Sequence, residues 1–223
     1  MTPPLRLDPA DRERRRARIR GLYAVTPDGL PDDRLLEQCR AVLAGGTRLL
    51  QYRNKAADTG TRSRQALALR SLTREHAALL IVNDDAELAA ACDADGVHLG
   101  REDGQAAAVL ARFPGLLVGV SCYADLDRAC LACAAGADYL AFGSVAASPT
   151  KPEAVAAPLS LFAAARPLGL PLVAIGGITL DNAASIRRAG ADALAVISAL
   201  FDHPDPAAQA AAFAERIKEG THS

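Results

Sequence analysis

Eight short apolar runs, separated by segments of helical length, predict an α/β fold of parallel strands joined by helical crossovers. The runs are apolar on both faces, which is typical of strands buried inside a parallel sheet. Four stretches of the sequence resemble one another and recur at separations of about 43–54 residues. Each is interpreted as a helix end, a Gly or Asp turn and then a strand. That spacing suits two strand–helix units, so we expect a (β/α)8 TIM barrel, with an open doubly wound sheet as the main alternative.

Each run is bounded by turn residues, and each intervening segment has helical length and apolar spacing. In chain order the strands are expected at Gly21–Thr26, Arg48–Tyr52, Leu79–Val82, Gly96–Leu99, Leu117–Ser121, Tyr139–Phe142, Leu172–Ile175 and Ala193–Ile197. The clearest helices are expected at Asp32–Ala44, Thr61–His76 and Asp181–Ala189. The repeated stretches are "AGGTRLL" (44–50), "CDADGVHL" (92–99), "AGADYLAF" (135–142) and "AGADALAV" (189–196).

Residues 1–18 lie outside this pattern, and residues 19–218 form the predicted barrel as a single domain. The basic stretch "DRERRRARIR" contains interleaved acids, so we interpret it as a solvated extension or helix rather than a nucleic-acid-binding arm. No GxGxxG motif follows the first strand, which argues against a dinucleotide-binding fold.

Composition narrows the function classes. The net charge of −1 gives no general attraction to nucleic acid or to an anionic membrane. No apolar stretch approaches the ~18 residues of a membrane-spanning helix, and no basic-then-apolar signal pattern begins the chain. Five scattered cysteines indicate a reducing compartment, the cytoplasm, rather than a disulfide framework.

Cationic side chains follow two of the predicted strands at the barrel end where chemistry is expected. Arg53 and Lys55 follow the second strand, and Lys151 lies beyond the sixth. Arginine can fork onto two phosphate oxygens and lysine supplies a point charge, so these residues suit a bound diphosphate.

Carboxylates follow the third and fourth strands. Asp84 and Asp103 are hard oxygen ligands of the kind that Mg2+ takes, together with substrate phosphate oxygens and water. A strand-end aspartate is also a common helix cap, and Asp85 or Glu102 could be the ligand instead. His98 is interpreted as a structural strand-end histidine rather than a catalyst.

Two further segments suit a second phosphate. Gly176-Gly177 and Ser198 follow the seventh and eighth strands, where exposed backbone N–H groups commonly bind an anion in this fold. A simple turn is the alternative interpretation of the glycine pair. The sequence thus suggests one diphosphate bound with a metal and one monophosphate.

The same residues carry a resemblance to a known family. The segments "QYRNK" (51–55), "VND" (82–84), "DGVHLGREDG" (95–104), "GVS" (119–121), "SPTK" (148–151), "AIGGI" (174–178) and "VIS" (196–198) occur in the order and context of the thiamine phosphate synthases. The resemblance extends from about Gly21 to Phe201. It implies an enzyme that couples 4-amino-2-methyl-5-(diphosphomethyl)pyrimidine to 4-methyl-5-(2-phosphoethyl)thiazole, or its carboxylated form, and releases diphosphate by a Mg-assisted dissociative substitution.

The resemblance also assigns residues. The positions that match the pyrimidine-diphosphate contacts are Gln51, Arg53, Lys55, Asn83, Ser121 and Lys151. Those that match the thiazole-phosphate contacts are Ser148, Thr150, Gly177, Ile197 and Ser198. Tyr52, Asn54 and Pro149 are included with the substrate-binding segments, and Asp84 and Asp103 match the Mg2+ ligands. We assign the catalytic part to Arg53, Lys55, Ser121 and Lys151.

Two positions depart from the family pattern. Ser148 stands where threonine is usual, and Asp85 stands where a basic residue is frequent, which puts the charge near the diphosphate in doubt. The alternatives are a thiazole tautomerase-like barrel and a non-catalytic thiamine-phosphate-binding barrel. The expected partners are small-molecule substrates, without nucleic acid or membrane, and a homo-oligomer is compatible with the sequence.

Overall fold

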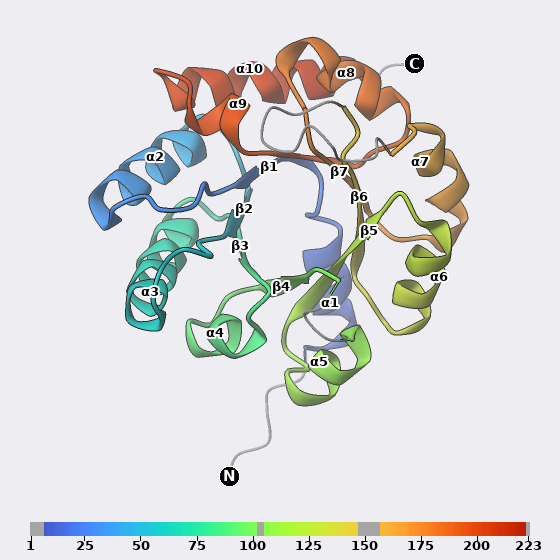
Figure 1. Ribbon diagram of the computed structural model, residues 1–223, viewed down its shortest axis with the longest axis horizontal. Coiled ribbons are helices and arrows are strands. Elements are labelled where there is room, and N and C mark those ends of the chain that lie inside the picture. The colour runs from blue at the N-terminus through green and yellow to red at the C-terminus, as the bar shows by residue number, and fades with distance from the viewer. Residues whose placement is uncertain (1–6, 102–104, 147–156, 222–223) are drawn as a thin grey trace.

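Eight parallel strands form a closed barrel in which β1 to β8 pair in chain order and β8 pairs with β1 (Figure 1). The structure is a computed structural model that describes residues 7–101, 105–146 and 157–221. The strands are β1 (Gly21–Val25), β2 (Leu49–Tyr52), β3 (Leu79–Asn83), β4 (Gly96–Leu99), β5 (Leu117–Tyr123), β6 (Tyr139–Gly143), β7 (Leu172–Ile175) and β8 (Ala193–Val196). The predicted (β/α)8 fold is confirmed, and every predicted strand bound lies within about two residues of the observed one.

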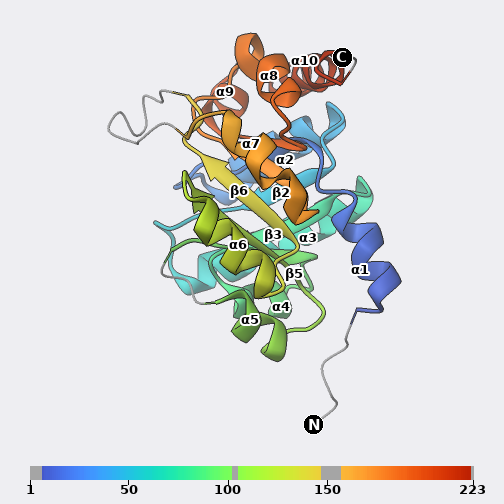
Figure 2. The same ribbon diagram turned by 90° about the vertical axis from the view of Figure 1, so that its right-hand side faces the viewer.

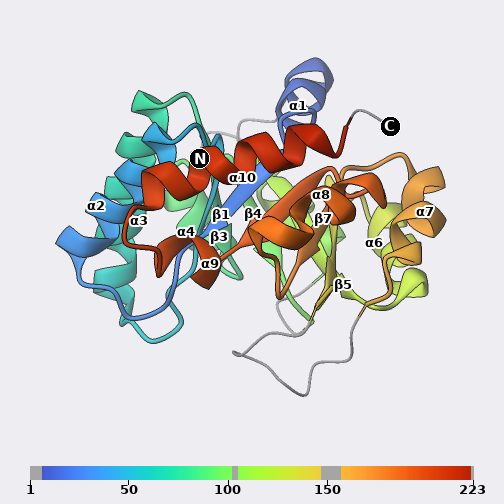
Figure 3. The same ribbon diagram turned by 90° about the horizontal axis from the view of Figure 1, so that it is seen from above.

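Helices surround the barrel (Figure 1). They are α2 (Asp32–Ala44), α3 (Thr59–Glu75), α4 (Ala86–Ala91), α5 (Ala106–Arg112), α6 (Leu126–Ala134), α7 (Ser160–Ala165) with the short η1 (Arg166–Leu168), α8 (Leu180–Arg188), α9 (Ser198–Phe201) and α10 (Pro206–Glu219). Helix α10 lies between α2 and α8 and covers β1, beside the point where the barrel closes (Figure 3).

Side chains alternate along each strand between two apolar layers. Leu50 of β2 belongs to the layer between the strands and the helices, whereas Leu49 belongs to the barrel interior. The interior is filled by strand residues such as Tyr23, Ile81 and Tyr139, so it is a packed core and not a pore. Functional groups are therefore confined to the two ends. We call the end where the strands finish the carboxyl face, and the end where they begin the amino face.

The repeated stretches have a structural role at the amino face. Asp95, Asp138 and Asp192 each precede an even-numbered strand, and each accepts a hydrogen bond from a backbone N–H in the first two residues of the preceding strand, at 2.8–2.9 Å. The carboxylates thus join neighbouring strands where the ladder begins. Thr47 lies in the corresponding stretch before β2, and its buried hydroxyl has no hydrogen-bond partner within the described part of the chain.

The basic N-terminal segment forms helix α1 (Pro9–Arg16), which lies beside the amino face (Figure 2). Arg12 donates to Asp138 at 2.5 Å and to the carbonyl oxygens of Pro114 and Leu116. Arg15 donates to Asp95 at 3.3 Å. The arginines of α1 therefore bind the barrel as well as contacting solvent. The predicted boundary at residue 18 falls just before Ile19, which is buried in the barrel interior.

Candidate active site at the carboxyl face

The loop after β2 is fixed to the end of β1. The hydroxyl of Thr26, which is fully buried, accepts from the backbone N–H of Arg53 and donates to the Arg53 carbonyl oxygen, both at 2.8 Å. Gln51 points into the barrel interior, because it alternates with the outward residues Leu50 and Tyr52. Arg53, the first residue after β2, is therefore held at the rim of the barrel, two positions beyond Gln51.

Asp28 organises both cations that follow β2. Its carboxylate forms an ion pair with Arg53 and accepts a hydrogen bond from the backbone N–H of Lys55 at 2.7 Å. The sequence analysis did not single out Asp28, which lies two residues beyond Thr26, the last residue of the first predicted strand. The signal was a carboxylate close to a strand end on the catalytic side of the barrel.

Asp84 lies at the end of β3 in the left-handed region, with φ of 65°. Aspartate tolerates that conformation better than most residues, and its backbone N–H donates to the His98 carbonyl oxygen at 2.8 Å. Its carboxylate is 23% exposed and lies 2.7 Å from the Lys55 ammonium group. A carboxylate and a cation from the ends of neighbouring strands thus meet at the rim of the barrel.

Asp85 has a different environment from Asp84. One carboxylate oxygen accepts from the Leu88 backbone N–H at 2.8 Å and caps α4, while the other pairs with Arg62 of α3 at 2.9 Å. Both carboxylate oxygens of Asp85 are thus engaged in contacts within the fold, whereas the Asp84 carboxylate pairs with Lys55 at the rim. Arg62 also supplies a positive charge next to the position where the departure from the family pattern raised doubt.

Two residues of the QYRNK segment point away from the barrel interior. The Tyr52 hydroxyl donates to the Gln65 side chain at 2.8 Å in the layer between β2 and α3, and burial raises the Tyr52 pKa to about 12. The Asn54 amide donates to the same Gln65 oxygen at 3.0 Å and accepts from the Gly29 N–H. The structure therefore places both side chains where they support the loops around Arg53 and Lys55.

A chain of hydrogen bonds crosses the barrel interior beneath the rim. Gln51 donates to the Tyr23 hydroxyl at 2.8 Å, and the Tyr23 and Tyr139 hydroxyls are 3.0 Å apart. His98 Nδ1 lies 3.1 Å from the Tyr139 hydroxyl, and His98 Nε2 lies 2.8 Å from Ser121 Oγ. Two predicted substrate contacts, Gln51 and Ser121, are thus connected through residues that sequence reasoning left without a substrate role.

The predicted second phosphate region lies after β7 and β8, which pair directly with each other. Gly176 and Gly177 both have positive φ, of 96° and 68°, a conformation that glycine adopts readily. Ile197 is half-buried, and Ser198 is exposed at the start of α9. The glycine pair and Ser198 therefore lie at neighbouring strand ends on the same face as Arg53.

Some predicted residues lie outside the described part of the chain, namely Asp103, Ser148, Pro149, Thr150 and Lys151. Asn83 ends β3, next to Asp84. Among the described residues no cluster of three or more His, Cys, Asp or Glu side chains could hold a metal ion, and none of the helices is both long and apolar enough to cross a membrane.

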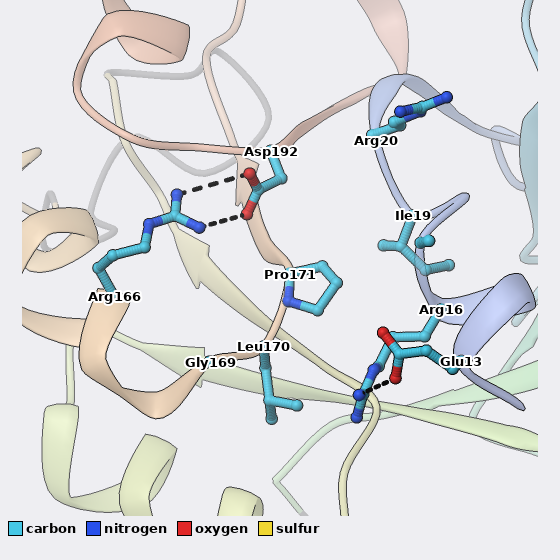
Figure 4. Close-up of a pocket in the computed structure, with 10 residues that line it drawn as sticks. Glu13, Arg16, Ile19, Arg20, Arg166, Gly169, Leu170, Pro171 and Asp192 are labelled. Atoms are coloured by element: carbon cyan, nitrogen blue, oxygen red, sulfur yellow. Dashed lines mark hydrogen bonds and ion pairs between the residues drawn. The ribbon is translucent and has the colours of Figure 1, made fainter. Parts of the chain in front are cut away.

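A cavity of about 300 Å3 lies at the opposite end of the molecule, between α1 and the η1–β7 loop (Figure 4). Arg166 faces Asp192 there and Arg16 faces Glu13, so two of the cationic groups that line it are paired with carboxylates. It contains none of the predicted site residues. The described residues to which the sequence assigned substrate or metal contacts lie at the carboxyl face instead.

A family model, two sequence relatives and one solved structure that resemble this chain share one described activity. The family model described as thiamine monophosphate synthase matches residues 22–200. The thiamine-phosphate synthase of Chromobacterium violaceum is 58% identical over 88% of this chain and 96% of its own length, and that of Aromatoleum aromaticum is 55% identical over 88% and 95%. The structure of thiamine phosphate pyrophosphorylase from Pyrococcus furiosus, at 36% identity, superposes with a TM-score of 0.81 over 92% of this chain and 98% of its own.

The match includes the whole barrel and extends over nearly the full length of these relatives. The predicted activity, that of a transferase which makes thiamine phosphate, is confirmed at this level of similarity. The chain belongs to the thiamine monophosphate synthase family.

Proposed function

We propose that the carboxyl face binds a pyrimidinylmethyl diphosphate and a thiazole phosphate together, and joins them with release of diphosphate. The observation that carries this proposal is the charged cluster of Arg53, Lys55, Asp28 and Asp84 at the ends of β1, β2 and β3. Its cations are partly exposed and suit phosphate oxygens, and its position is where this fold places its chemistry.

The proposed reaction is dissociative. The bond between the pyrimidine methylene carbon and the diphosphate oxygen breaks first, and the thiazole nitrogen then forms the new bond to that carbon. Negative charge grows on the leaving diphosphate, so Arg53, Lys55 and Lys151 stabilise the transition state more than the ground state. No nucleophilic side chain is required, and the protein mainly positions the two substrates.

We propose Asp84, with Asp103, as the residues that would hold Mg2+. Asp84 offers a hard carboxylate oxygen that is 23% exposed and lies beside the cation that would meet the diphosphate, so it fits such an ion. When bound, Mg2+ supplies positive charge that neutralises the diphosphate oxygens.

The ion pair between Lys55 and Asp84 has a specific role in this proposal. In the protein without ligands the two groups neutralise each other at 2.7 Å. The diphosphate is the better partner for the lysine, and a divalent cation is the better partner for the carboxylate. Binding would therefore exchange one internal ion pair for two interactions with ligands, and each ligand would favour binding of the other.

The thiazole phosphate is assigned to the ends of β7 and β8 and to the SPTK segment. Gly177 and Ser198 can offer backbone N–H groups, and Ser198 adds a hydroxyl. Ile197 packs against the apolar barrel interior beside Ser198. Ser148 and Thr150 are further proposed donors. We also propose a cytoplasmic location, which free thiols at all five cysteines support.

The experiment that tests the proposal is an endpoint assay with both substrates, in which thiamine phosphate is oxidised to fluorescent thiochrome. We expect product only when both substrates and Mg2+ are present, and none after addition of a chelator. Lys55→Ala should raise the KM for the pyrimidine diphosphate and lower kcat. Product at the same rate with chelator would contradict the metal assignment, and an unchanged Lys55→Ala enzyme would contradict the diphosphate assignment.

A further inference from the structure

The hydrogen-bond chain inside the barrel has a direction, and that direction follows from counting protons. Each tyrosine hydroxyl has one proton to donate, and a neutral imidazole has one donor and one acceptor nitrogen. Tyr23 accepts from the Gln51 amide, so its own proton is left for Tyr139. Tyr139 then donates to His98 Nδ1, which leaves Nε2 as the donor to Ser121 Oγ.

The same count excludes a chain in which Tyr139 donates to Tyr23, because Gln51 already donates to Tyr23. Tyr23 would accept from both Gln51 and Tyr139, and its own proton would have no acceptor among the described residues, although Tyr23 is only 1% exposed. A buried donor without a partner is costly. Burial also raises the pKa of both Tyr23 and Tyr139, so both hydroxyls keep their protons.

The positions of the rings are fixed by the barrel around them. The Tyr139 ring stacks on His98 with 5.6 Å between ring centroids and meets the edge of Tyr23 at 6.2 Å. Gly119 of β5 lies against the Tyr139 ring, and a Cβ atom at Gly119 would overlap that ring. The space for the ring therefore exists only because residue 119 has no side chain.

We propose that Tyr139, acting through His98, is a positioning residue that presents the Ser121 hydroxyl to the substrate as a hydrogen-bond donor. Because Ser121 accepts from His98, its own proton is directed away from the chain. The Tyr23 hydroxyl of the same chain accepts from the Gln51 NH2 group, so we infer that the Gln51 carbonyl oxygen is left to accept from the substrate. This inference rests on the proposed contact of Ser121 and Gln51 with the pyrimidine diphosphate.

The experiment compares Tyr139→Phe, Ser121→Ala and the double variant. Tyr139→Phe keeps the ring and removes only the hydroxyl, so we expect kcat to fall about tenfold with little change in KM. The double variant should have the kcat of Ser121→Ala within about twofold, since the proposed effect of Tyr139 on the substrate passes through His98 and Ser121, whereas Gln51 bonds Tyr23 directly. Thr73→Val is the matched control, because it removes a buried hydroxyl that bonds Arg70 on α3, and it should leave kcat unchanged.

The outcomes separate the two proposals. An unchanged kcat in Ser121→Ala would contradict the proposed substrate contact. A reduced kcat in Ser121→Ala with an unchanged or independently additive effect of Tyr139→Phe would overturn the positioning role alone.

A second pair of variants tests the positioning role if Tyr139→Phe fails to fold. His98→Gln keeps an N–H donor for Ser121, whereas His98→Leu removes it. We expect His98→Gln to retain severalfold more activity than His98→Leu. Equal loss in the two variants would overturn the positioning role.

Discussion

The two ends of the barrel both carry aspartate–arginine or aspartate–lysine pairs, but the pairs differ in their contact with water. At the amino face the Asp138 side chain is 2% exposed and lies 2.5 Å from Arg12. At the carboxyl face Asp84 is 23% exposed, and Lys55, its partner at 2.7 Å, is 57% exposed. Similar distances therefore conceal a large difference in solvation.

Attachment to the backbone differs as well. Asp95, Asp138 and Asp192 each accept a backbone N–H from a neighbouring strand, so these carboxylates are part of the strand ladder. No described backbone N–H donates to the Asp84 carboxylate, which contacts Lys55 alone among the described residues. The ion pairs that stabilise the fold are therefore buried and hydrogen-bonded to the backbone. The ion pair that we propose to exchange its partners for ligands is more exposed and has no such backbone hydrogen bond among the described residues.

The largest expected effect on stability is at the amino face. Asp138→Ala removes the partner of Arg12 and the acceptor for the Val118 N–H, so we expect the free energy of unfolding to fall by about 3 kcal/mol. Asp11→Ala is the control, since its pair with Arg14 is exposed and should contribute less than about 0.5 kcal/mol. Urea unfolding measures both. Equal losses in the two variants would remove the distinction between buried and exposed pairs.

The converse change is Asp84→Asn at the carboxyl face. We expect turnover to fall about 100-fold, since the variant loses a charged group that we propose to act in the transition state, while stability changes by less than about 1 kcal/mol. Asp93→Asn is a close match, because Asp93 also has a positive φ and pairs with an arginine, but lies before β4 at the amino face. Turnover of Asp93→Asn should equal that of the unsubstituted protein in the thiochrome assay.

Alkaline pH should reduce stability through two thiols in the apolar layer between the strands and the helices. Burial raises the pKa of the Cys39 and Cys122 thiols from 9.0 to about 12. The folded state keeps these protons while the unfolded chain loses them above pH 9, so stability is complete below pH 9 and falls as pH rises towards 12. Each thiol contributes a loss of about 1.4 kcal/mol per pH unit.

Unfolding free energies at pH 8, 9 and 10 would measure this slope. A double Cys39→Ala, Cys122→Ala variant should lose most of it. A slope that persists unchanged in the double variant would assign the alkaline sensitivity to other groups.

The smallest expected effect concerns the repeat position that lacks an aspartate. The buried Thr47 hydroxyl has no partner among the described residues, so its burial is uncompensated. Thr47→Val replaces it with a methyl group of similar size, and we expect a gain in stability of up to about 1 kcal/mol. A loss of stability in a thermal or urea unfolding experiment would show that the hydroxyl does have a partner.

Much of the architecture could be predicted because it depends on local patterns. The strands are short apolar runs, and their bounds follow from turn residues such as Gly136 and Asp138. The charged site could be anticipated because parallel strands bring their ends to one face, so Arg53 and Asp84 had to lie near each other. Alternation along β2 could also have shown that Tyr52 points towards the helices rather than the barrel interior.

The connections across the barrel could not be predicted in the same way. The Tyr23 and Tyr139 hydroxyls meet although they are separated by 116 positions in the chain. Alternation shows that both point inward, but which inward residues meet depends on the stagger of the strands around the closed barrel. For the same reason His98 could be interpreted only as a strand-end residue, and its contact with Ser121 was not foreseen.

Closure of the barrel has a consequence for synthesis of the chain on the ribosome. Helix α1 is synthesised early, but Asp138, which accepts from Arg12 of this helix, is added 126 residues later. Strand β1 can pair with its second neighbour only when β8 has been made. At about 5–20 residues per second, the partners of these N-terminal elements are synthesised roughly 6 to 35 seconds later. During that interval one side of β1 is an unpaired strand edge, so the nascent chain should depend more on chaperones than the finished barrel does.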